Sequence, residues 1–444
     1  MDRHLATCIG AGLISGFVIG YYANRYFSTK IFNLPRNQFE NRARKSCVSN
    51  DLFIKGLYKD VKTQTHNNAI AYTAQENFPD LKDNKSYMAR YLTQEKYTEM
   101  YSHTTPLGFT IDQTIQIGVD NPSKKGCGIL AGDEYCYDVF NMVFDPVINE
   151  RHKEFRRRDG TAPKQLINLS NKELQFDSKY VKSTYFLISR CLHGFRFPAS
   201  CSRAERNAIE LHLKTALLAL TGSNTGTYIH LTDMTSKVKT SLPDILQTAS
   251  NIIFDRKLSS RGTFHDWPSG RGIFYNSQHS LLAWINFEDH LRLMYCSEEL
   301  NFLESYKKFQ SAMVELEANL LQKNLKFAYH CGYGYLVSCP SGIGTALRAT
   351  VSVDLPNTIR HERFHIIAEN LRLHLGAKDQ DALKKGWLDV YNKDRLGFTE
   401  EELLYQVADA VLKLCEIETR LEADNSLIDV MSYKSILDEL KINN

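Results

Sequence analysis

The sequence carries little net charge and has no clustered cysteines. Its 54 lysines and arginines nearly balance its 51 aspartates and glutamates, so the formal net charge is +3. A charge this small does not favour nucleic-acid binding. The ten cysteines form neither a Cys-x-x-Cys pair nor a Cys/His cluster, which argues against a zinc site and against a small disulfide scaffold. A reducing compartment is the simpler assumption.

Internal repeats and low-complexity tracts are also absent, so an ordinary globular protein is expected. The composition, 43% hydrophobic and 24% charged, is typical of that class. A length of 444 residues predicts two or three domains and allows a large core.

The N-terminal residues 1–23 differ from the rest of the chain. They include an uncharged run from Leu5 to Ala23 that is about long enough to cross a bilayer as a helix. Three interpretations stay open for this segment: a membrane anchor, a mitochondrial presequence, and a buried or disordered extension. Residues 24–65 are polar and lack a clear period, which is typical of a linker.

A half-buried strand is predicted at residues 347–355, where apolar and polar residues alternate strictly. An earlier strand, residues 333–338, is expected to end at a tight turn, because Pro340 and two glycines follow Cys339. The turn would present the Cys339 thiol near Arg348. A thiol beside fixed cations is a candidate for chemistry, although a lone cysteine at the end of a strand is more often structural. The cysteines at 127, 136, 191, 201, 296, 331 and 415 are assigned to packing.

Other patterns predict helices and a strand pair. Ser202 with Glu205, and Thr399 with Glu402, have the spacing of capping boxes at the start of two long amphipathic helices. Shorter helices are expected within residues 88–101 and 109–117. Residues 272–293 favour paired strands, and continued alternation through residues 284–292 would bring Glu288 and Arg292 to one face.

The block CPSGIGTALRA, residues 339–349, resembles the active-site block of the ATP:guanidino phosphotransferases, the phosphagen kinases that include creatine kinase and arginine kinase. Further similar blocks are WINFEDHLR (284–292), DWPSGRGIFYN (266–276), GFTIDQTIQIGVDNP (108–122) and DRLGFTEEEL (394–403). The resemblance extends over roughly residues 66–432 and is closer to creatine kinases than to arginine kinases.

The resemblance implies an α+β protein with a small all-helical N-terminal domain and a larger domain built on an antiparallel β-sheet flanked by helices. The expected boundaries are 66–152 for the helical domain, 153–179 for a crossing linker, 180–432 for the catalytic domain and 433–444 for a tail.

It also implies phosphoryl transfer between Mg²⁺-bound ATP/ADP and a guanidino compound, with the magnesium carried by the nucleotide rather than by protein side chains. Such a reaction needs a carboxylate on the guanidinium and fixed arginines on the phosphates. The matching positions are Glu288 for the carboxylate, Cys339 for the family's reactive cysteine, Arg292 and Arg348 for the phosphate-holding arginines, and Asp394 for a nucleotide-side aspartate. Taken singly, each has an ordinary alternative: Glu288 pairs with Arg292 or His290, Arg348 is solvated, and Asp394 caps a turn.

The sequence departs from the family pattern at several site positions. Phe287 replaces the first acid of the family's N-E-E-D-H block, and Ser352 replaces a histidine. An ungapped alignment, which we favour, puts Tyr185 and Leu187 where two phosphate-binding arginines are expected; a gapped alignment instead matches Arg190 to one of them. The loop at residues 375–386 lacks the family's arginine and offers only lysines.

Two functions therefore stay open. The first is a creatine-kinase-like phosphagen kinase that buffers cellular energy. The second is a catalytically impaired relative that binds nucleotide or a partner protein at a membrane. A mitochondrial location is expected, with a cytoplasmic one as the alternative, and a homo-oligomer is possible within this family; the guanidino substrate is not identified.

Overall fold

The computed structural model describes residues 72–152, 174–234, 264–360, 364–376 and 386–423. The chain divides into two compact units, Met1–Lys62 and Thr63–Asn444, and every described residue belongs to the second unit. The expected N-terminal segment, linker and tail, most of the crossing linker, and the lysines of the 375–386 loop lie outside the described residues. The domain boundaries stay predictions.

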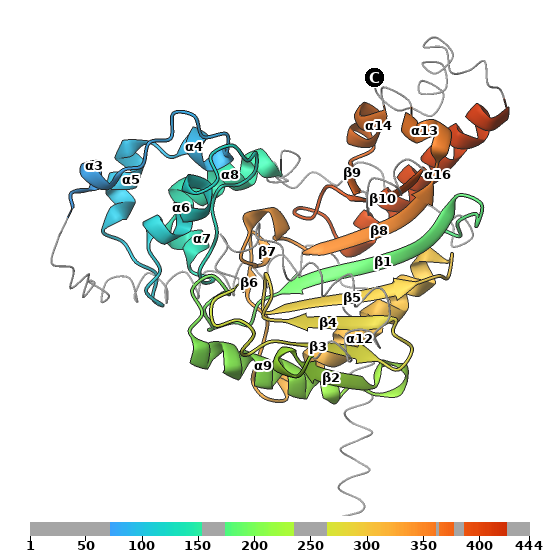
Figure 1. The fold of residues 1–444 in the computed structure, drawn as a ribbon, viewed down its shortest axis with the longest axis horizontal. Helices are drawn as coiled ribbons and strands as arrows, with labels where there is room; N and C mark the ends of the chain where they lie inside the picture. The colour runs from blue at the N-terminus through green and yellow to red at the C-terminus, as the bar shows by residue number, and fades with distance from the viewer. Residues whose placement is uncertain (1–71, 153–173, 235–263, 361–363, 377–385, 424–444) are drawn as a thin grey trace, which may run out of the picture. The chain divides into compact units, whose positions relative to one another are not determined.

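The first described part of the chain is helical (Figure 1). Its helices are α3 (Ala74–Asn77), α4 (Tyr87–Tyr91), α5 (Gln94–Tyr101), α6 (Ile111–Val119), α7 (Cys136–Val139) and α8 (Asn141–Arg151). Thr110 begins α6 with a capping box, in the region where a short helix was predicted. The helical stretch expected within residues 88–101 is split, because Thr93 accepts from the Lys96 amide and so starts a second helix.

The larger part is built on an antiparallel sheet of eight strands in the order β2-β3-β4-β5-β1-β8-β10-β9 (Figure 1). The strands are β1 (Val181–Arg190), β2 (Gly226–His230), β3 (Gly272–Asn276), β4 (Leu281–Ile285), β5 (Leu291–Ser297), β8 (Leu347–Asp354), β9 (Leu373–Gly376) and β10 (Trp387–Asn392). A separate two-stranded ribbon joins β6 (Tyr329–His330) to β7 (Gly334–Tyr335). The α+β fold expected from the sequence is confirmed.

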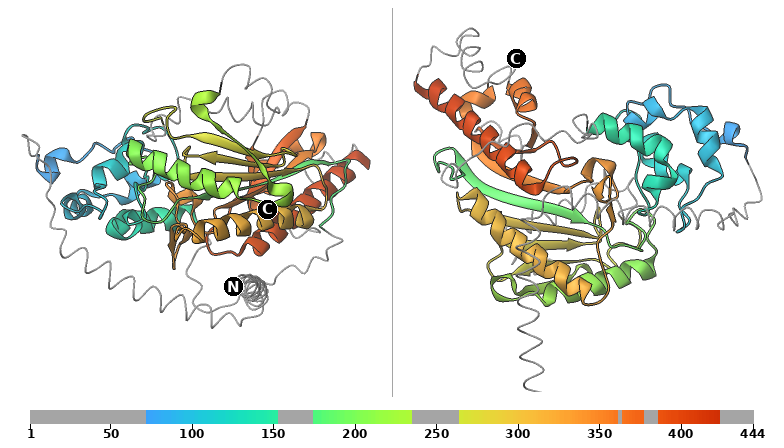
Figure 2. Two further views of the ribbon diagram at one scale, coloured as in Figure 1. Left: turned by 90° about the horizontal axis from the view of Figure 1, so that it is seen from below. Right: turned by 180° about the vertical axis from the view of Figure 1, so that it is seen from behind.

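Helices cover one face of this sheet. They are α9 (Arg203–Leu218), α12 (Phe302–Leu321) and α16 (Glu400–Ala423), and they lie in front of the strands in the right-hand view of Figure 2. The apolar residues of β8 and the alternate residues Phe186 and Ile188 of β1 share one core with these helices. Because side chains alternate along a strand, the intervening residues of β1 and β8 project from the opposite face.

Both predicted capping boxes are present. Ser202 and Glu205 exchange hydrogen bonds at the start of α9, and Thr399 and Glu402 do so at the start of α16. Two shorter helices, α13 (Pro356–Arg360) and α14 (Phe364–Asn370), follow β8.

Two predicted strands differ from the structure. The alternation expected through residues 284–292 is interrupted after β4, where Asn286 takes a left-handed conformation (φ 56°) and a turn leads to β5. The strand expected at residues 333–338 is reduced to Gly334–Tyr335. The chain beyond it is held by separate contacts on two sides, because the Leu336 amide donates to the Ala328 carbonyl and the Ala131 amide to the Ser338 carbonyl.

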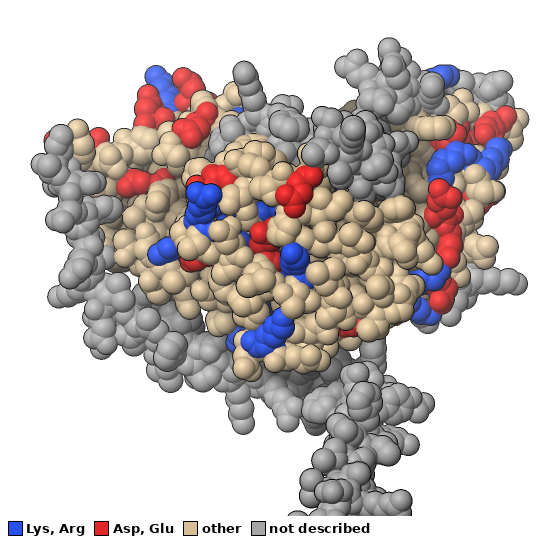
Figure 3. All heavy atoms as spheres, turned by 60° about the horizontal axis from the view of Figure 1, so that its bottom comes forward, with Lys and Arg blue, Asp and Glu red and all other residues tan. Residues whose placement is uncertain are grey.

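The surface agrees with the nearly balanced composition. On the face drawn in Figure 3, Lys and Arg lie among Asp and Glu, and no extended patch of one sign is visible over the described residues. No helix in the described ranges is long and apolar enough to cross a membrane.

A buried carboxylate on α16 supports the start of α13. Glu418 is fully buried and accepts four hydrogen bonds, from the amides and the side chains of Asn357 and Thr358. Glu418→Ala should lower the free energy of unfolding by about 3 kcal/mol, since buried donors lose their acceptor. Urea unfolding should rank wild type above Glu418→Gln, which keeps one acceptor oxygen, and Glu418→Gln above Glu418→Ala. Equal stability of wild type and Glu418→Ala would contradict this assignment.

Candidate active site

Two arginines flank the central strand on the sheet face opposite the helices. In the register of the sheet, Arg348 on β8 pairs with Leu187 on β1, and Arg292 on β5 pairs with Ser189 on β1. Directly paired residues share a face, and so do residues two apart on one strand. Arg292, Arg348, Leu187 and Tyr185 therefore project from the same face. The Arg348 guanidinium lies 3.6 Å from the ring centroid of Tyr391 on β10, which fixes its orientation.

Arg395 and Arg151 join these two arginines. Removal from water and the positive charges of Arg151, Arg348 and Arg292 together lower the pKa of Arg395 to about 10. The Nε atoms of Arg292, Arg348 and Arg395 are buried without a hydrogen-bond partner. Gathering like charges with unsatisfied donors costs free energy unless an anion binds among them. The arrangement is thus suited to a ligand that carries several negative charges.

The sequence reasoning missed Arg151 and Arg395. Arg395 follows Asp394 directly in the D-R-L-G block, and Arg151 precedes His152 at the end of α8. Arg395 could have been found from its place inside the matching D-R-L-G block. No sequence pattern points to Arg151, because its approach to the other arginines depends on how the helical part packs.

Glu288 lies in the turn between β4 and β5. Its Oε2 is 3.0 Å from Nη1 of Arg292, and both side chains are 24% exposed. An ion pair with this exposure stabilises the fold only weakly. A guanidinium ligand could therefore compete with Arg292 for the Glu288 carboxylate at small cost.

The turn that carries Glu288 is bonded to the residue before Cys339. The Ser338 amide donates to the buried Asp289 carboxylate (2.9 Å), and the Ser338 hydroxyl donates to the Glu288 carbonyl (3.1 Å). Burial raises the pKa of Asp289, and the hydrogen bond from Ser338 opposes that rise. These bonds bring Glu288 and Cys339 into one site although they are distant in sequence.

Cys339 begins the short 3₁₀ helix η4 (Pro340–Gly342). Its Sγ is 3.1 Å from the Ser341 hydroxyl. Nε2 of His152, at the end of α8, lies 3.0 Å from the Pro340 carbonyl oxygen. The helical part of the chain therefore helps to hold the turn that presents the thiol.

Comparison with known proteins identifies the family. The model of the ATP:guanido phosphotransferase C-terminal catalytic domain matches residues 208–421, and the model of the N-terminal domain of the same family matches residues 82–149. The chain belongs to the ATP:guanido phosphotransferase family.

Individual relatives are similar over most of their length. The testis isozyme of creatine kinase from Oncorhynchus mykiss is 37% identical over 371 residues, which cover 80% of this chain and 94% of the relative. Creatine kinase B-type from Gallus gallus is 38% identical over 374 residues, with coverages of 82% and 96%. The crystal structure of lombricine kinase superposes with a TM-score of 0.73 at 32% identity, covering 84% of this chain and all of that chain. These findings support guanidino phosphotransfer as the class of reaction.

Two of the positions that differ from the family pattern meet at one carboxylate. The Tyr185 hydroxyl donates to Oδ2 of Asp389, and the Ser352 hydroxyl donates to its Oδ1 at 2.5 Å. Burial and the Asp389 charge raise the pKa of Tyr185, so the phenol stays protonated. Phe287 is buried and packs on Trp284, with ring centroids 5.7 Å apart. At positions 185 and 352 the chain has internal contacts in place of side chains that could bind an anion, and at position 287 a packed ring stands where the family pattern has an acid.

The structure does not bring Arg190 to the arginine cluster. Arg190 is fully buried on the helix-covered face of β1, where its guanidinium stacks on Tyr335 at 3.6 Å. Nη2 lies 3.8 Å from the Glu400 carboxylate. These contacts favour the ungapped alignment, in which Tyr185 and Leu187 occupy the strand positions on the arginine face.

Asp394 is engaged by an arginine. Both carboxylate oxygens bind the guanidinium of Arg372, with Nε at 2.7 Å from Oδ2, in a bidentate pair. The Arg372–Asp394 pair joins the residue before β9 to the residue before Arg395.

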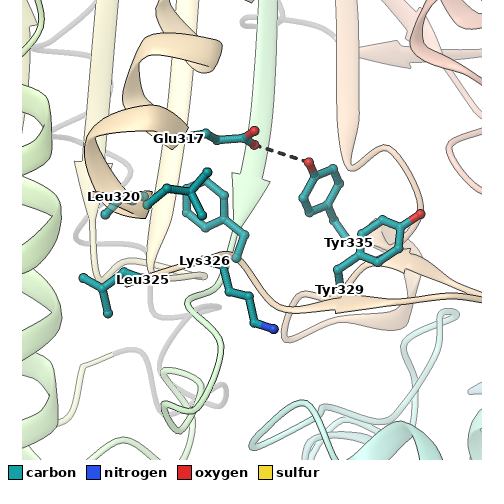
Figure 4. A pocket seen from close by; sticks show the side chains of 8 residues that line it. Glu317, Leu320, Leu325, Lys326, Tyr329 and Tyr335 are labelled. Atoms are coloured by element: carbon teal, nitrogen blue, oxygen red, sulfur yellow. Dashed lines mark hydrogen bonds between the residues drawn. The ribbon is translucent and has the colours of Figure 1, made fainter. Parts of the chain in front are cut away.

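A cavity of about 180 Å³ lies away from these residues, at the end of α12. Figure 4 shows Glu317 and Tyr335 pointing toward one another across it, joined by a hydrogen bond of 3.3 Å. Its lining contains no arginine, so it does not belong to the candidate phosphate site. Over the described ranges, no group of three or more His, Cys, Asp or Glu side chains could hold a metal ion.

Cys331 is an exception to the packing assignment, because it is disulfide-bonded. Cys127, Cys136, Cys191 and Cys201 are buried, as that assignment expects.

Buried histidines make stability depend on pH. Burial lowers the pKa of His290 to about 4, below the ordinary value of about 6.5. The unfolded chain then binds the proton more tightly, so stability present above pH ~6.5 is lost as the pH falls toward 4. His290 Nδ1 accepts from the Leu192 amide, and its Nε2 lies at the Arg196 carbonyl, both at 2.9 Å. The side-chain amide of a glutamine contains one acceptor and one donor group for the same two partners.

The stability advantage of wild type over His290→Gln should therefore shrink by about 2 kcal/mol between pH 7.5 and pH 5. Urea unfolding at the two pH values measures it. His279→Gln, at a turn residue that is exposed, is the control and should show no such change. A constant difference for His290→Gln would mean that His290 is not held neutral.

Proposed function

We propose that this protein catalyses reversible phosphoryl transfer between ATP and a creatine-like guanidino compound. The observation that carries the proposal is the arginine cluster with its unpartnered buried Nε atoms, next to a turn on which Glu288 and Cys339 are held together. One part of this site suits phosphates and the other suits a guanidinium, and the reaction joins these two groups.

Each side chain has a chemical task in this proposal. Arg292, Arg348 and Arg395 hold the phosphates in line and offset the negative charge that the transferring group carries. The Glu288 carboxylate orients the guanidinium and accepts a proton from it. The Cys339 sulfur, as a thiolate, would lie against the same cation. The nucleotide would carry a bound Mg²⁺, which would neutralise part of its phosphate charge.

The Glu288–Arg292 ion pair links the two halves of the site. When a guanidinium binds Glu288, Arg292 loses part of its partner and gains freedom to contact phosphate. Binding of the guanidino compound and binding of the nucleotide are thus expected to favour each other. The physical reason is that a carboxylate shared between two cations leaves each of them less neutralised.

A second candidate function has its own support. Tyr185 and Leu187 stand on the arginine face where the family resemblance expects two arginines, and Tyr185 is bonded to Asp389 instead. Removing one charged contact to the transition state commonly costs two to three decades in rate, about 3–4 kcal/mol. A relative that binds nucleotide but turns over slowly, and acts through a partner protein, is therefore the alternative.

A coupled assay on the full chain separates the two. We expect turnover with Mg-ATP and at least one of creatine, arginine, glycocyamine, taurocyamine and lombricine. Glu288→Gln should lower kcat at least about 100-fold, because general-base catalysis contributes about that much. Glu304→Gln, which removes an exposed carboxylate paired with Lys307, is the matched control and should keep full activity.

Absence of turnover from folded protein, together with magnesium-dependent stabilisation by ATP, would favour the impaired relative. Failure to bind nucleotide at all would contradict both candidates. Calorimetry with Mg-ADP on wild type and on Arg348→Ala gives the binding part of the test independently of catalysis.

The two replaced positions allow a gain-of-function prediction. The double variant Tyr185→Arg/Leu187→Arg should raise kcat about 10-fold or more if missing phosphate contacts limit the rate, since each restored charged contact is worth about 1.5–3 kcal/mol. Lys182→Arg is the control, because Lys182 is an exposed residue of the same strand. An unchanged rate in the folded double variant would mean that other steps limit turnover.

We also propose a mitochondrial location, which rests on the uncharged run at residues 5–23, interpreted as a membrane anchor or a mitochondrial presequence. Subcellular fractionation of the full chain and of a chain lacking residues 1–23 would test it. Release of both forms into the cytosol would contradict it. A homo-oligomer, as family members form, is measurable on the same material by light scattering.

A further inference from the structure

A histidine on β9 lies beside the candidate phosphate site. His374 pairs with Tyr391 on β10, with ring centroids 5.5 Å apart, and the Tyr391 ring in turn holds the Arg348 guanidinium at 3.6 Å. Leu373 belongs to the core under the helices, so alternation along β9 directs His374 to the arginine face. A Cβ at Gly376, two residues further along this face, would lie 3.8 Å from Nη2 of Arg348. Strand pairing thus sets the imidazole next to the arginines.

His374 accepts a hydrogen bond from one of these arginines. Its Nε2 lies 3.2 Å from Nη2 of Arg151, at the end of α8. A guanidinium only donates hydrogen bonds, so Nε2 accepts, and the proton of the neutral ring lies on Nδ1. A second proton on the ring would turn an N–H toward the guanidinium and break this hydrogen bond. The contact therefore holds His374 neutral while no anion is bound.

The charges around His374 favour the same neutral form. Burial lowers the pKa of His374 to about 4, and so do four neighbouring cations, Arg151, Lys393, Arg395 and Arg348. They come from α8, from β8 and from the segment after β10. A polyanion bound among these cations would offset their charge and raise the pKa of the imidazole toward its ordinary value or beyond it.

We propose that His374 is a phosphate-binding residue of the candidate site, which gives up its hydrogen bond from Arg151, takes a proton from solvent and donates Nε2–H to a phosphate oxygen of the nucleotide. The inference rests on the proposed function, in which the arginine cluster holds the phosphates of ATP or ADP. Tyr185 and Leu187 carry no charge on this face of the sheet, where the family resemblance expects two arginines. His374 supplies a positive charge there only when an anion is present.

Proton uptake links nucleotide affinity to pH. If bound nucleotide restores the ordinary pKa of about 6.5, His374 at pH 6 is about 1% protonated in the free protein and about 75% protonated in the complex. A group that gains a proton on binding favours binding at pH values below its pKa in the complex. The histidine should therefore strengthen binding about fourfold at pH 6 and hardly at all at pH 8.

The test is calorimetry of Mg-ADP binding to the full chain at pH 8 and at pH 6, with the pH 6 titration in two buffers of different ionisation enthalpy, MES and imidazole. The buffer dependence of the observed enthalpy gives the number of protons taken up. At pH 6, wild type should take up at least about half a proton more per nucleotide than His374→Gln, and its affinity relative to the variant should rise about fourfold from pH 8 to pH 6. Protons exchanged by the nucleotide itself cancel in this difference.

The variants separate phosphate binding from a structural role. A glutamine can accept the hydrogen bond from Arg151 but does not titrate, so a purely structural His374 would leave no difference in proton uptake. His365→Gln is the matched control and should behave as wild type, because His365 is exposed on α14, the helix before β9. Equal proton uptake by wild type and His374→Gln would overturn this inference and leave the proposed function standing. Failure of folded wild type to bind Mg-ADP would overturn both.

A fixed charge at the same position gives a second test, which also serves if His374→Gln does not fold. His374→Lys carries its cation at pH 8, where His374 of wild type is neutral even in the complex. The lysine variant should bind Mg-ADP more tightly than wild type at pH 8 and should take up fewer protons than wild type at pH 6. Affinity at pH 8 no greater than that of wild type would contradict a phosphate contact at this position. The readout is binding, so it does not depend on turnover of any guanidino compound.

Discussion

The buried carboxylate of Asp289 is the contact on which the candidate site depends. It accepts the Ser338 amide at 2.9 Å and lies 3.7 Å from the Cys191 sulfur, while the next residue in the chain, His290, bonds the Leu192 amide. One turn between β4 and β5 is thereby joined to the end of β1 and to the segment before Cys339. Glu288 precedes Asp289 directly, so its position relative to the thiol follows from these bonds. Breaking these hydrogen bonds would leave the Asp289 carboxylate buried without a partner, which costs free energy.

Electrostatics distinguishes the two sides of the site. On the proposed nucleotide side, like charges are gathered and buried donors lack hydrogen-bond partners, which costs free energy that a bound anion would recover. On the proposed guanidino side, the Glu288 carboxylate is paired with Arg292. Tyr185 and Ser352, which differ from the family pattern, add no positive charge to the arginine cluster. Their hydroxyls donate to the Asp389 carboxylate instead.

Several elements were predictable because their signals are local. The capping boxes at Ser202 and Thr399 and the strand at residues 347–355 each depend on neighbours within a few residues, and each is found in the structure. The strand is not half-buried as predicted, because the polar residues Thr350 and Ser352 are buried too. The predicted alternation through residues 284–292 was wrong, because Asn286 turns the chain with a left-handed conformation. That turn, rather than an extended strand, brings Glu288 to Arg292. Local pattern does not reveal such a turn when no glycine marks it.

The sequence by itself determined the family, the α+β fold class and the identity of the residues in the matching blocks, because these reside in the order of side chains along short segments. Only the tertiary structure decided which side chains meet. Sheet register put Arg190 on the helix-covered face and Tyr185 on the arginine face, and packing of the helical part brought Arg151 near Arg395. The physical reason is that these contacts join residues far apart in the chain, and their geometry follows from strand pairing and core packing rather than from sequence neighbours.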